Sequence, residues 1–165
     1  MRPKSIYFKI IHFKSLTNMA NKYLVVLVAS WLLGQSNLGF AQNNKLGVIE
    51  LKTGIYRIEA EIADTLAARL TGLMYRTYLP MNAGMLFVFE EKAIHCFNMR
   101  NTKIPLSIAF LDYDGKIVSV ADMEPETLNH HCPRSAVSYA IEMNQKWFAQ
   151  RAIGPGTVIQ GLPKK

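Results

Sequence analysis

Two apolar runs, each the length of a buried strand, flank a short polar segment in the middle of the chain. The runs are residues 85–89 and 106–111, and glycine, proline or Asp-Gly turn residues bound them. Apolar runs of this length between turn residues are typical of buried strands. We therefore expect residues 84–118 to organise the fold, and we look first for a functional site in the segment between the two runs.

The surrounding sequence predicts more short strands and one clear helix. Residues 54–63 alternate apolar and polar side chains with a period of two, which is typical of a half-buried antiparallel strand. Asp64 is the predicted N-cap of the helix, in which Leu66, Leu70 and Leu73 recur at helical spacing. Further strands are predicted at residues 45–51, 116–123, 136–143 and 157–160, and a short helix at residues 145–152.

These elements predict a mainly β protein. The pattern gives about seven to nine short strands joined by turns, with one or two short helices and no internal repeat. Many short strands favour an antiparallel sandwich or a jelly-roll-like barrel over a parallel α/β sheet. We expect residues 42–165 to form a single β-rich domain.

The first 41 residues have the features of a secretory signal peptide. A short basic start at residues 19–22 precedes an apolar run at residues 23–33, and small residues occupy positions 39 and 41. Met19 is a possible true start of translation. The alternative is a retained membrane anchor, but the run is short for a membrane span. We expect a periplasmic or secreted protein, not stably inserted in the membrane after cleavage.

Removal of this leader changes the charge of the chain. The full sequence has a formal net charge of +7, but five of its 19 basic residues and none of its 12 acidic residues precede residue 42. The remaining domain therefore carries a net charge of only +2. A charge this small gives no indication of nucleic-acid binding, which needs a basic patch on the folded domain.

Two cysteines and three histidines cluster in the sequence after residue 41. In an oxidising compartment an even pair of cysteines first predicts a disulfide, here between Cys96 and Cys132. A copper or zinc site is the alternative, although no ligand spacing supports it, and unpaired or catalytic thiols are a further one. No other cofactor is expected. The metal-ligand candidates are His95, Cys96, His130, His131 and Cys132.

A donor-rich loop at residues 97–103 is the candidate recognition site. Its guanidinium, amide and ammonium groups could bind an anion or another polar ligand, whereas the alternative is ordinary solvated loop polarity. Arg69 and Arg76 could extend this clamp, or cover the edge of the sheet and pair with Glu90 or Glu91. The ligand-binding candidates are Arg69, Arg76, Asn98, Arg100, Asn101, Thr102 and Lys103.

Nothing in the chain gives positive evidence of catalysis. Asp112 and Asp114 could suggest acid–base chemistry, but an Asp-Gly hairpin turn explains Asp114. A glycine-rich phosphate loop, a serine-centred elbow and a metalloprotease motif are all absent from the sequence.

Several ordered motifs resemble the successive signatures of the domain of unknown function 192 family. They are residues 69–76 (RLTGLMYR), 84–89 (GMLFVF), 99–106 (MRNTKIPL) and 108–110 (IAF). The resemblance covers residues 46–162. It implies a compact, β-rich, jelly-roll-like domain that is often exported in bacteria and has no established activity.

The chain departs from the family pattern at two positions. Asn98 stands where the family usually has an aromatic residue, typically Trp, and Ser107 stands where it usually has Asp. A family-wide role for either side chain is therefore in doubt here. The His-Cys pairs at residues 95–96 and 131–132 look like a subgroup trait, which favours a link between their two loops.

The resulting hypothesis is a small, exported, non-enzymatic binding or accessory domain. Its ligand would be a polar small molecule, a saccharide, a cell-envelope component or an acidic peptide; this step is an analogy from fold. The alternative hypothesis is a periplasmic metal-handling or thiol-redox protein that uses the His/Cys cluster.

Overall fold

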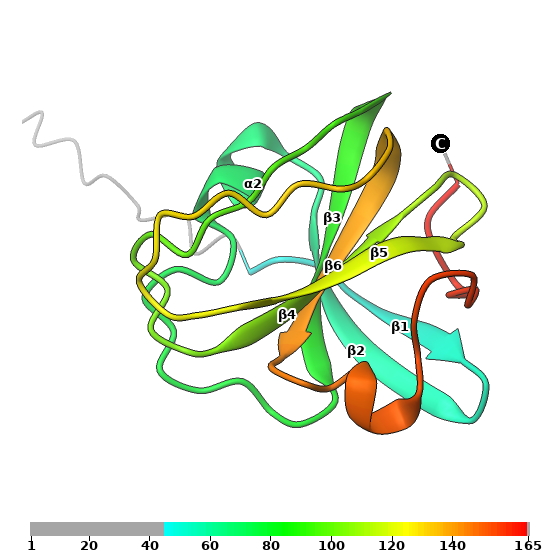
Figure 1. The fold of residues 1–165 in the computed structure, drawn as a ribbon, viewed down its shortest axis with the longest axis horizontal. Coiled ribbons are helices and arrows are strands. Elements are labelled where there is room, and N and C mark those ends of the chain that lie inside the picture. The colour runs from blue at the N-terminus through cyan, green and yellow to red at the C-terminus, as the bar shows by residue number, and fades with distance from the viewer. Residues whose placement is uncertain (1–44, 165) are drawn as a thin grey trace, which may run out of the picture. The chain divides into compact units, whose positions relative to one another are not determined.

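The computed structural model describes residues 45–164. The predicted signal peptide, including the possible start at Met19, lies outside these residues. The described chain forms six strands, one short α-helix and one turn of 3-10 helix (Figure 1). In chain order they are β1 (Val48–Thr53), β2 (Tyr56–Ala63), α2 (Leu66–Thr71), β3 (Ala83–Ala93), β4 (Leu106–Leu111), β5 (Ile117–Met123), β6 (Val137–Asn144) and η1 (Ala149–Arg151).

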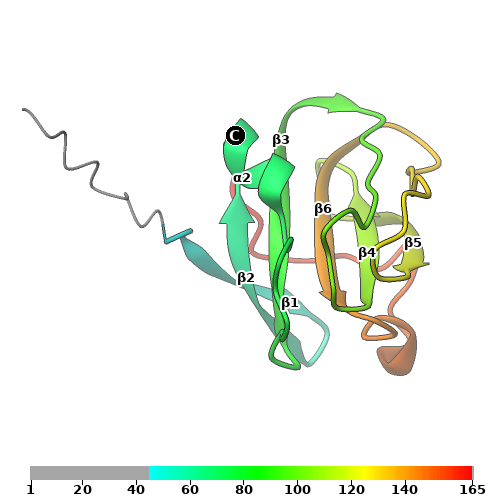
Figure 2. The ribbon, with the colours of Figure 1, turned by 90° about the vertical axis from the view of Figure 1, so that its left-hand side faces the viewer.

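The strands form a single mixed sheet in the order β1-β2-β3-β6-β4-β5. Figure 2 shows β1–β3 in one half of this sheet and β4–β6 in the other. The mainly β prediction is confirmed. The prediction of an antiparallel sandwich or jelly-roll-like barrel is not: β2 and β3 pair in parallel, and among residues 45–164 the six strands form one open sheet. The parallel pair arises because α2 and the loop after it form a crossover connection between β2 and β3.

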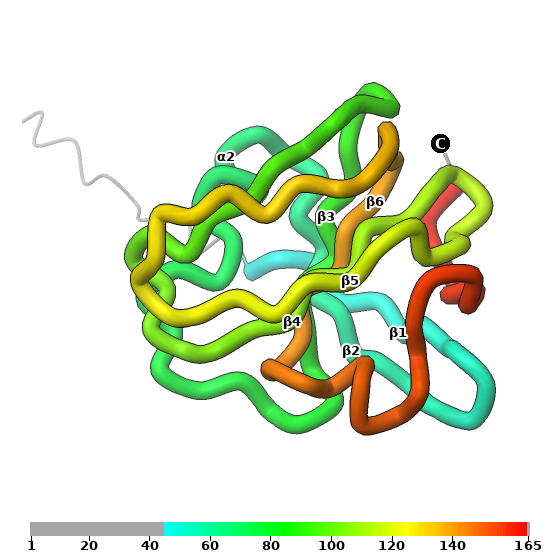
Figure 3. Tube along the Cα trace, in the orientation of Figure 1, coloured from blue at the N-terminus to red at the C-terminus, as the bar shows by residue number. Residues whose placement is uncertain are grey.

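The last predicted strand, residues 157–160, forms only isolated bridges. Val158 pairs with Lys116 beside β5, and Gln160 pairs with Lys52 of β1. The segment thus runs from one edge of the sheet to the other, as the trace in Figure 3 shows. Partial edge coverage of this kind limits the unpaired backbone that edge strands expose. Because residues 157–160 form only isolated bridges, they are not a strand of the sheet, which has six strands and not the seven to nine predicted.

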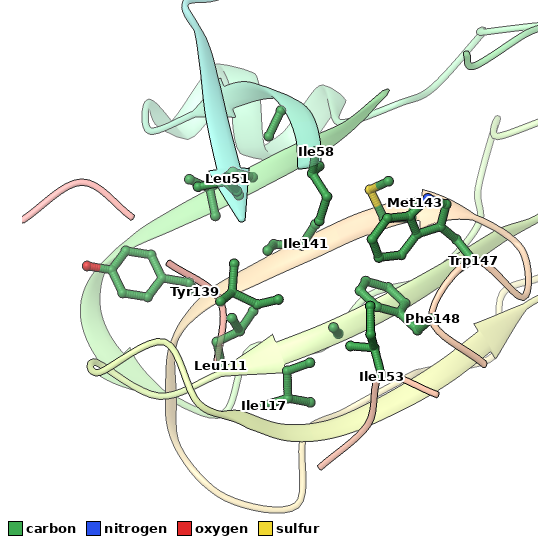
Figure 4. Packing of buried hydrophobic residues seen from close by; sticks show 14 of the residues in the cluster. Leu51, Ile58, Leu111, Ile117, Tyr139, Ile141, Met143, Trp147, Phe148 and Ile153 are labelled. Atoms are coloured by element: carbon green, nitrogen blue, oxygen red, sulfur yellow. The ribbon is translucent and has the colours of Figure 1, made fainter. Parts of the chain in front are cut away.

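One face of the sheet packs on a large apolar cluster (Figure 4). Trp147 and Phe148, from the turn after β6, lie 2% and 0% exposed against strand residues such as Ile58 and Ile141. The indole N–H of Trp147 donates to Asn82 Oδ1 at 3.2 Å, so its polar edge is satisfied. The helix predicted at 145–152 is here only a turn followed by η1.

The opposite face packs on a second apolar cluster, built from alternate residues of the same strands. On β3, for example, Met85, Phe87 and Phe89 point to this side, whereas Leu86 and Val88 point to the first cluster. Such alternation is the consequence of the period-two geometry of a strand. Both faces of the central strands are therefore buried, which explains their continuous apolar sequences.

The helix α2 differs from its prediction in its cap and in its apolar face. Thr65, not Asp64, is the N-cap, and its hydroxyl oxygen accepts from the Ala68 N–H at 3.1 Å. Leu73 is buried as expected, but Leu66 and Leu70 are 65% and 67% exposed. The helix is therefore anchored mainly by the segment that comes after it, which includes Leu73. None of the described helices is long and apolar enough to cross a membrane.

Candidate functional site

Two extended segments pair beside α2 and form a short ribbon, residues 94–100 with residues 127–132. Phe97 and His131 exchange both backbone hydrogen bonds, at 2.9 and 2.8 Å, and the Met99 N–H donates to the Thr127 carbonyl at 2.9 Å. Figure 1 shows the two segments running together outside the sheet. The Cys96–Cys132 disulfide ties the ribbon, with its Cα atoms 4.2 Å apart. The disulfide prediction is confirmed.

This arrangement leaves the metal hypothesis without structural support. The two bridged cysteines have no thiolate to offer a metal. Within the described residues, no group of three or more His, Cys, Asp or Glu side chains could hold a metal ion. Copper or zinc binding is therefore not proposed for the disulfide-bonded form.

A groove of about 890 Å³ is lined by both α2 and the ribbon. Ligand sites in proteins are commonly of this size. Phe87, Phe89 and Phe97 lie at its base, and only Phe97 is more than 5% exposed. Six residues singled out from the sequence line the groove: Arg69, His95, Cys96, Asn98, Arg100 and His130. Its other lining residues are Leu66, Leu70, Met74, Glu90, Glu91 and Ile94.

Arg69 lines the groove, but its guanidinium is fully engaged within the protein. It donates to the backbone carbonyls of Asp64 and Val88 and pairs with Glu90 at 2.8 Å. These contacts connect α2 to β3, and the Arg69 side chain is only 15% exposed. The predicted pairing with Glu90 is confirmed, and Arg69 is a structural residue of the groove wall.

Arg76 lies outside this groove. Its guanidinium forms two hydrogen bonds of 2.6 Å with both carboxylate oxygens of Glu61 on β2. This hydrogen bonding raises the pKa of Arg76. The pair lines a separate pocket of about 540 Å³ beside α2, so the structure does not bring Arg76 together with residues 97–103.

Only part of the predicted polar loop faces the groove. Arg100 lines it and makes no side-chain contact of its own with a described polar group. The Asn98 side chain accepts from the Arg100 N–H at 3.0 Å and so fixes the turn. Thr102 is 5% exposed, and its hydroxyl donates to the Arg100 carbonyl. Lys103 is exposed but does not line the groove.

Asn101 instead locks the loop to the segment after α2. Its amide donates to the Tyr75 hydroxyl at 3.0 Å, and its carbonyl accepts from the Tyr75 N–H at 2.8 Å. Both residues have positive φ angles, 56° for Asn101 and 63° for Tyr75. Non-glycine residues adopt this conformation at a cost, so the surrounding contacts must hold it. These contacts therefore fix the loop against the segment after α2.

The three histidines have different surroundings. The His95 ring stacks on Phe89, with centroids 3.7 Å apart, and its Nε2 contacts the Glu91 carbonyl at 3.0 Å. His130 is exposed at the rim of the groove. His131 holds the ribbon through its backbone, and its buried Nε2 has no partner among the described residues.

The departure from the family pattern at Ser107 has a local explanation. The Ser107 hydroxyl donates to Asp122, its cross-strand neighbour on β5, and accepts from the Lys146 N–H at 2.8 Å. Burial raises the pKa of Asp122, but hydrogen bonds from Lys146 and Ser107 outweigh it and lower that pKa overall. A carboxylate is thus present one strand away from position 107. Ser107 is fully buried, so it cannot meet a ligand.

Sequence reasoning missed the apolar part of the groove. Leu66 and Leu70 lie four residues apart on α2, a spacing that was interpreted as a core-facing stripe. Their exposure, together with that of Ile94 at 53%, gives the groove its apolar rim. The one sequence signal for the exposure of Leu66 and Leu70 is the shortness of the helix, which ends before Gly72.

Comparison with known proteins gives a family but no activity. A crystal structure from Sinorhizobium meliloti 1021, provisionally labelled a transcription regulator, has 26% identity and a TM-score of 0.69, covering 71% of this chain and 95% of that one. A protein of unknown function from Novosphingobium aromaticivorans has 28% identity and a TM-score of 0.68, with 72% and 89% covered. No curated protein matches. Residues 48–161 match the family described as "Uncharacterized ACR". The chain therefore belongs to the domain of unknown function 192 family.

Proposed function

We propose that this domain is an exported, non-enzymatic binding or accessory module, and that the groove between α2 and the ribbon is its ligand site. The observation that carries the proposal is the groove itself, which gathers exposed apolar side chains and a guanidinium unpaired among the described residues over a base of mostly buried aromatic residues. A groove that combines apolar walls with a few polar groups is the usual form of a ligand site. Export is supported by the leader-like sequence of residues 1–41.

The lining favours a ligand with both a polar and an apolar part. The guanidinium of Arg100 is the candidate for a carboxylate or another acidic group, since it makes no contact with a described acid. The exposed leucines Leu66 and Leu70 suit an apolar part of the ligand. Saccharides, cell-envelope fragments and acidic peptides all satisfy this description.

The test is a ligand-observed NMR screen with defined probes: N-acetylglucosamine oligomers, a muramyl dipeptide and an acidic tripeptide. We expect at least one to bind the wild-type domain and to lose affinity by about two- to fivefold in Arg100→Ala, the usual range for one exposed charge pair. Lys103→Ala removes a cation of the same loop outside the groove, so it should leave binding unchanged. Equal effects of the two substitutions, or no binding of any probe, would argue against this site.

Thiol exchange is a second candidate function, favoured by the exposure of the disulfide. Cys96 and Cys132 are both exposed, and Cys96 lines the groove. A small thiolate could attack one sulfur, forming a mixed disulfide and releasing the other cysteine as a thiolate. Intact mass after acid quenching would detect glutathione added to the folded protein. Absence of the adduct until the protein is denatured would exclude this function.

A further inference from the structure

The ribbon has one edge that is paired and one edge that is open. Phe97 exchanges both its backbone bonds with His131, on the paired edge. The N–H and C=O groups of Cys96 and Asn98 make no hydrogen bond to any residue that the structure describes. Four backbone polar groups are therefore available side by side on one extended segment.

Strand geometry determines where these four groups point. In an antiparallel pair, the N–H and C=O of one residue point to the partner, and those of its two neighbours point the opposite way in the plane of the strands. Side chains alternate as well: Phe97 and Met99 pack inward, while Cys96 and Asn98 are exposed. Residues 127–132 occupy the paired edge of residues 96–98. The open edge is therefore directed to the opposite side, and Cys96 and Asn98 line the groove there.

Apolar side chains flank this open edge. Across the groove lie Leu66 and Leu70 of α2, and Ile94 lies on the ribbon segment itself; all three are more than half exposed. Beneath them lie Phe87, Phe89 and Phe97, of which only Phe97 is more than 5% exposed. An extended chain that presents apolar side chains at alternate positions matches a hydrogen-bonding edge beside an apolar wall.

Opposite charges flank residues 96–98: Arg100 at the end of the ribbon segment and Glu91 on β3. Arg100 follows residues 96–98, and Glu91 precedes them, and neither forms an ion pair with another described residue. The other two charged lining residues, Arg69 and Glu90, pair with each other. A bound chain with an acidic residue near Arg100 and a basic residue near Glu91 would complement this charge pattern.

We propose that the groove binds an extended peptide segment, which pairs with residues 96–98 as an added strand. The segment alternates apolar residues toward the groove floor and carries an acidic residue at the end nearest Arg100. This inference rests on the proposed function, because it names the ligand class of the same groove. It selects the peptide among the ligands that the lining alone admits, since a saccharide has no extended backbone that presents N–H and C=O groups at strand spacing along one edge.

The first experiment is selection of binders to the exported, disulfide-bonded domain from a random heptapeptide library. A selected peptide is then synthesised in two isomers, N-methylated on alternate amides of one edge or of the other. Pairing through one edge predicts that one isomer loses affinity by about tenfold or more, whereas the other stays within about threefold. Equal losses in both isomers, or no enriched peptide, would overturn the proposal.

A matched pair of protein variants tests the other side of the same bonds. Asn98→Pro removes the backbone N–H, and Asn98→Ala removes only the side chain that caps Arg100. We expect about a tenfold loss of peptide affinity in the first variant and less than about threefold in the second. Equal affinities of the two variants for the peptide would contradict strand pairing at residue 98. If Asn98→Pro does not fold, the N-methylated isomers alone decide the question.

Two further outcomes separate this inference from its alternatives. Probes such as N-acetylglucosamine oligomers that bind in an Arg100-dependent way, without any peptide binding, would overturn the peptide inference and leave the proposed function intact. A concentration-dependent dimer in analytical ultracentrifugation, abolished in Asn98→Pro, would show that the occupant of the open edge is a second copy of this chain, which also contradicts the proposal.

Discussion

The two faces of the sheet differ in what holds their covering segments in place. One face packs on the Trp147–Phe148 cluster, whose members are all apolar or aromatic and whose buried polar tips have partners. The other face contains the buried acid Glu142 and is covered by the ribbon and by loops fixed through hydrogen bonds and a disulfide. Both faces bury an apolar cluster, but the second also buries an acid. Because burying a charge without a partner is costly, we infer that the second face, which carries the proposed groove, is the less stabilising of the two.

Truncation of one aromatic residue on each face should give the largest difference in the free energy of unfolding. Phe148 is 0% exposed, so Phe148→Ala should lower the free energy of unfolding by about 3–5 kcal/mol. Phe97 is only half-buried, and Phe97→Ala should cost clearly less. Urea denaturation of both variants measures this difference. A larger loss for Phe97→Ala would reverse the assignment of the faces.

The disulfide has the next largest effect, and it belongs to the groove side. Its cysteines are 36 residues apart, so Cys96→Ser with Cys132→Ser should lower the free energy of unfolding by about 4 kcal/mol on the chain-entropy account. The backbone bonds of the ribbon remain, and the Trp147 cluster is remote from the change. The near-ultraviolet circular dichroism of the double variant should therefore resemble that of the wild type. A collapse of that signal would show that the two faces are not independent.

Glu142 gives the groove-side face a pH-dependent cost. It lies between Met85 and Ile108, both in the second cluster, and its carboxyl group makes no hydrogen bond with a described residue. Burial raises the pKa of Glu142 from 4.5 to about 8, so the folded state favours its neutral form. Stability is therefore highest below pH 4.5 as far as this group is concerned, falls as pH rises from 4.5 to about 8, and then levels off.

The corresponding variant is Glu142→Gln, which keeps the shape and removes the charge. At pH 7 the wild-type penalty amounts to about 3 kcal/mol, so the variant should be more stable there by up to that amount and equal to the wild type near pH 4. Thermal denaturation at several pH values measures the difference. A pH-independent difference between the two proteins would show that Glu142 does not titrate in this way.

The smallest effect in this series compares two arginines that line the same groove. Arg69→Ala leaves two carbonyls without their donor and should cost about 1–3 kcal/mol. Arg100 has no such contacts, and Arg100→Ala should change stability by less than about 0.5 kcal/mol. Chemical denaturation of the two variants checks both values. Similar losses for the two arginines would place Arg100 in the structure and not in the binding surface.

Local sequence patterns predicted much of the fold. The runs at 85–89 and 106–111 became the buried centres of β3 and β4, because uninterrupted apolar sequence fits strands covered on both faces. The alternation at residues 54–63 likewise became β2. The parallel pairing of β2 with β3 could not be predicted, since it depends on long-range contacts that leave no periodic signal.

The site was predicted in its composition but not in its geometry. The even pair of cysteines indicated the disulfide correctly, because such a pair is first interpreted as a bridge when export is expected. The sequence did not show whether Arg69 and Arg76 bind internal partners or a ligand, because a guanidinium can do either. The open backbone edge at residues 96–98 leaves no pattern in the amino-acid sequence, so it could be identified only from the structure.

The most direct test of the account is amide hydrogen exchange of the ribbon, measured residue by residue by NMR with and without a selected heptapeptide. The free domain should show protected amides at Phe97 and His131, which bond to each other, and fast exchange at Cys96 and Asn98. Peptide binding should slow exchange at Cys96 and Asn98 specifically. Unchanged exchange at these two amides with the peptide bound would contradict strand addition at the groove.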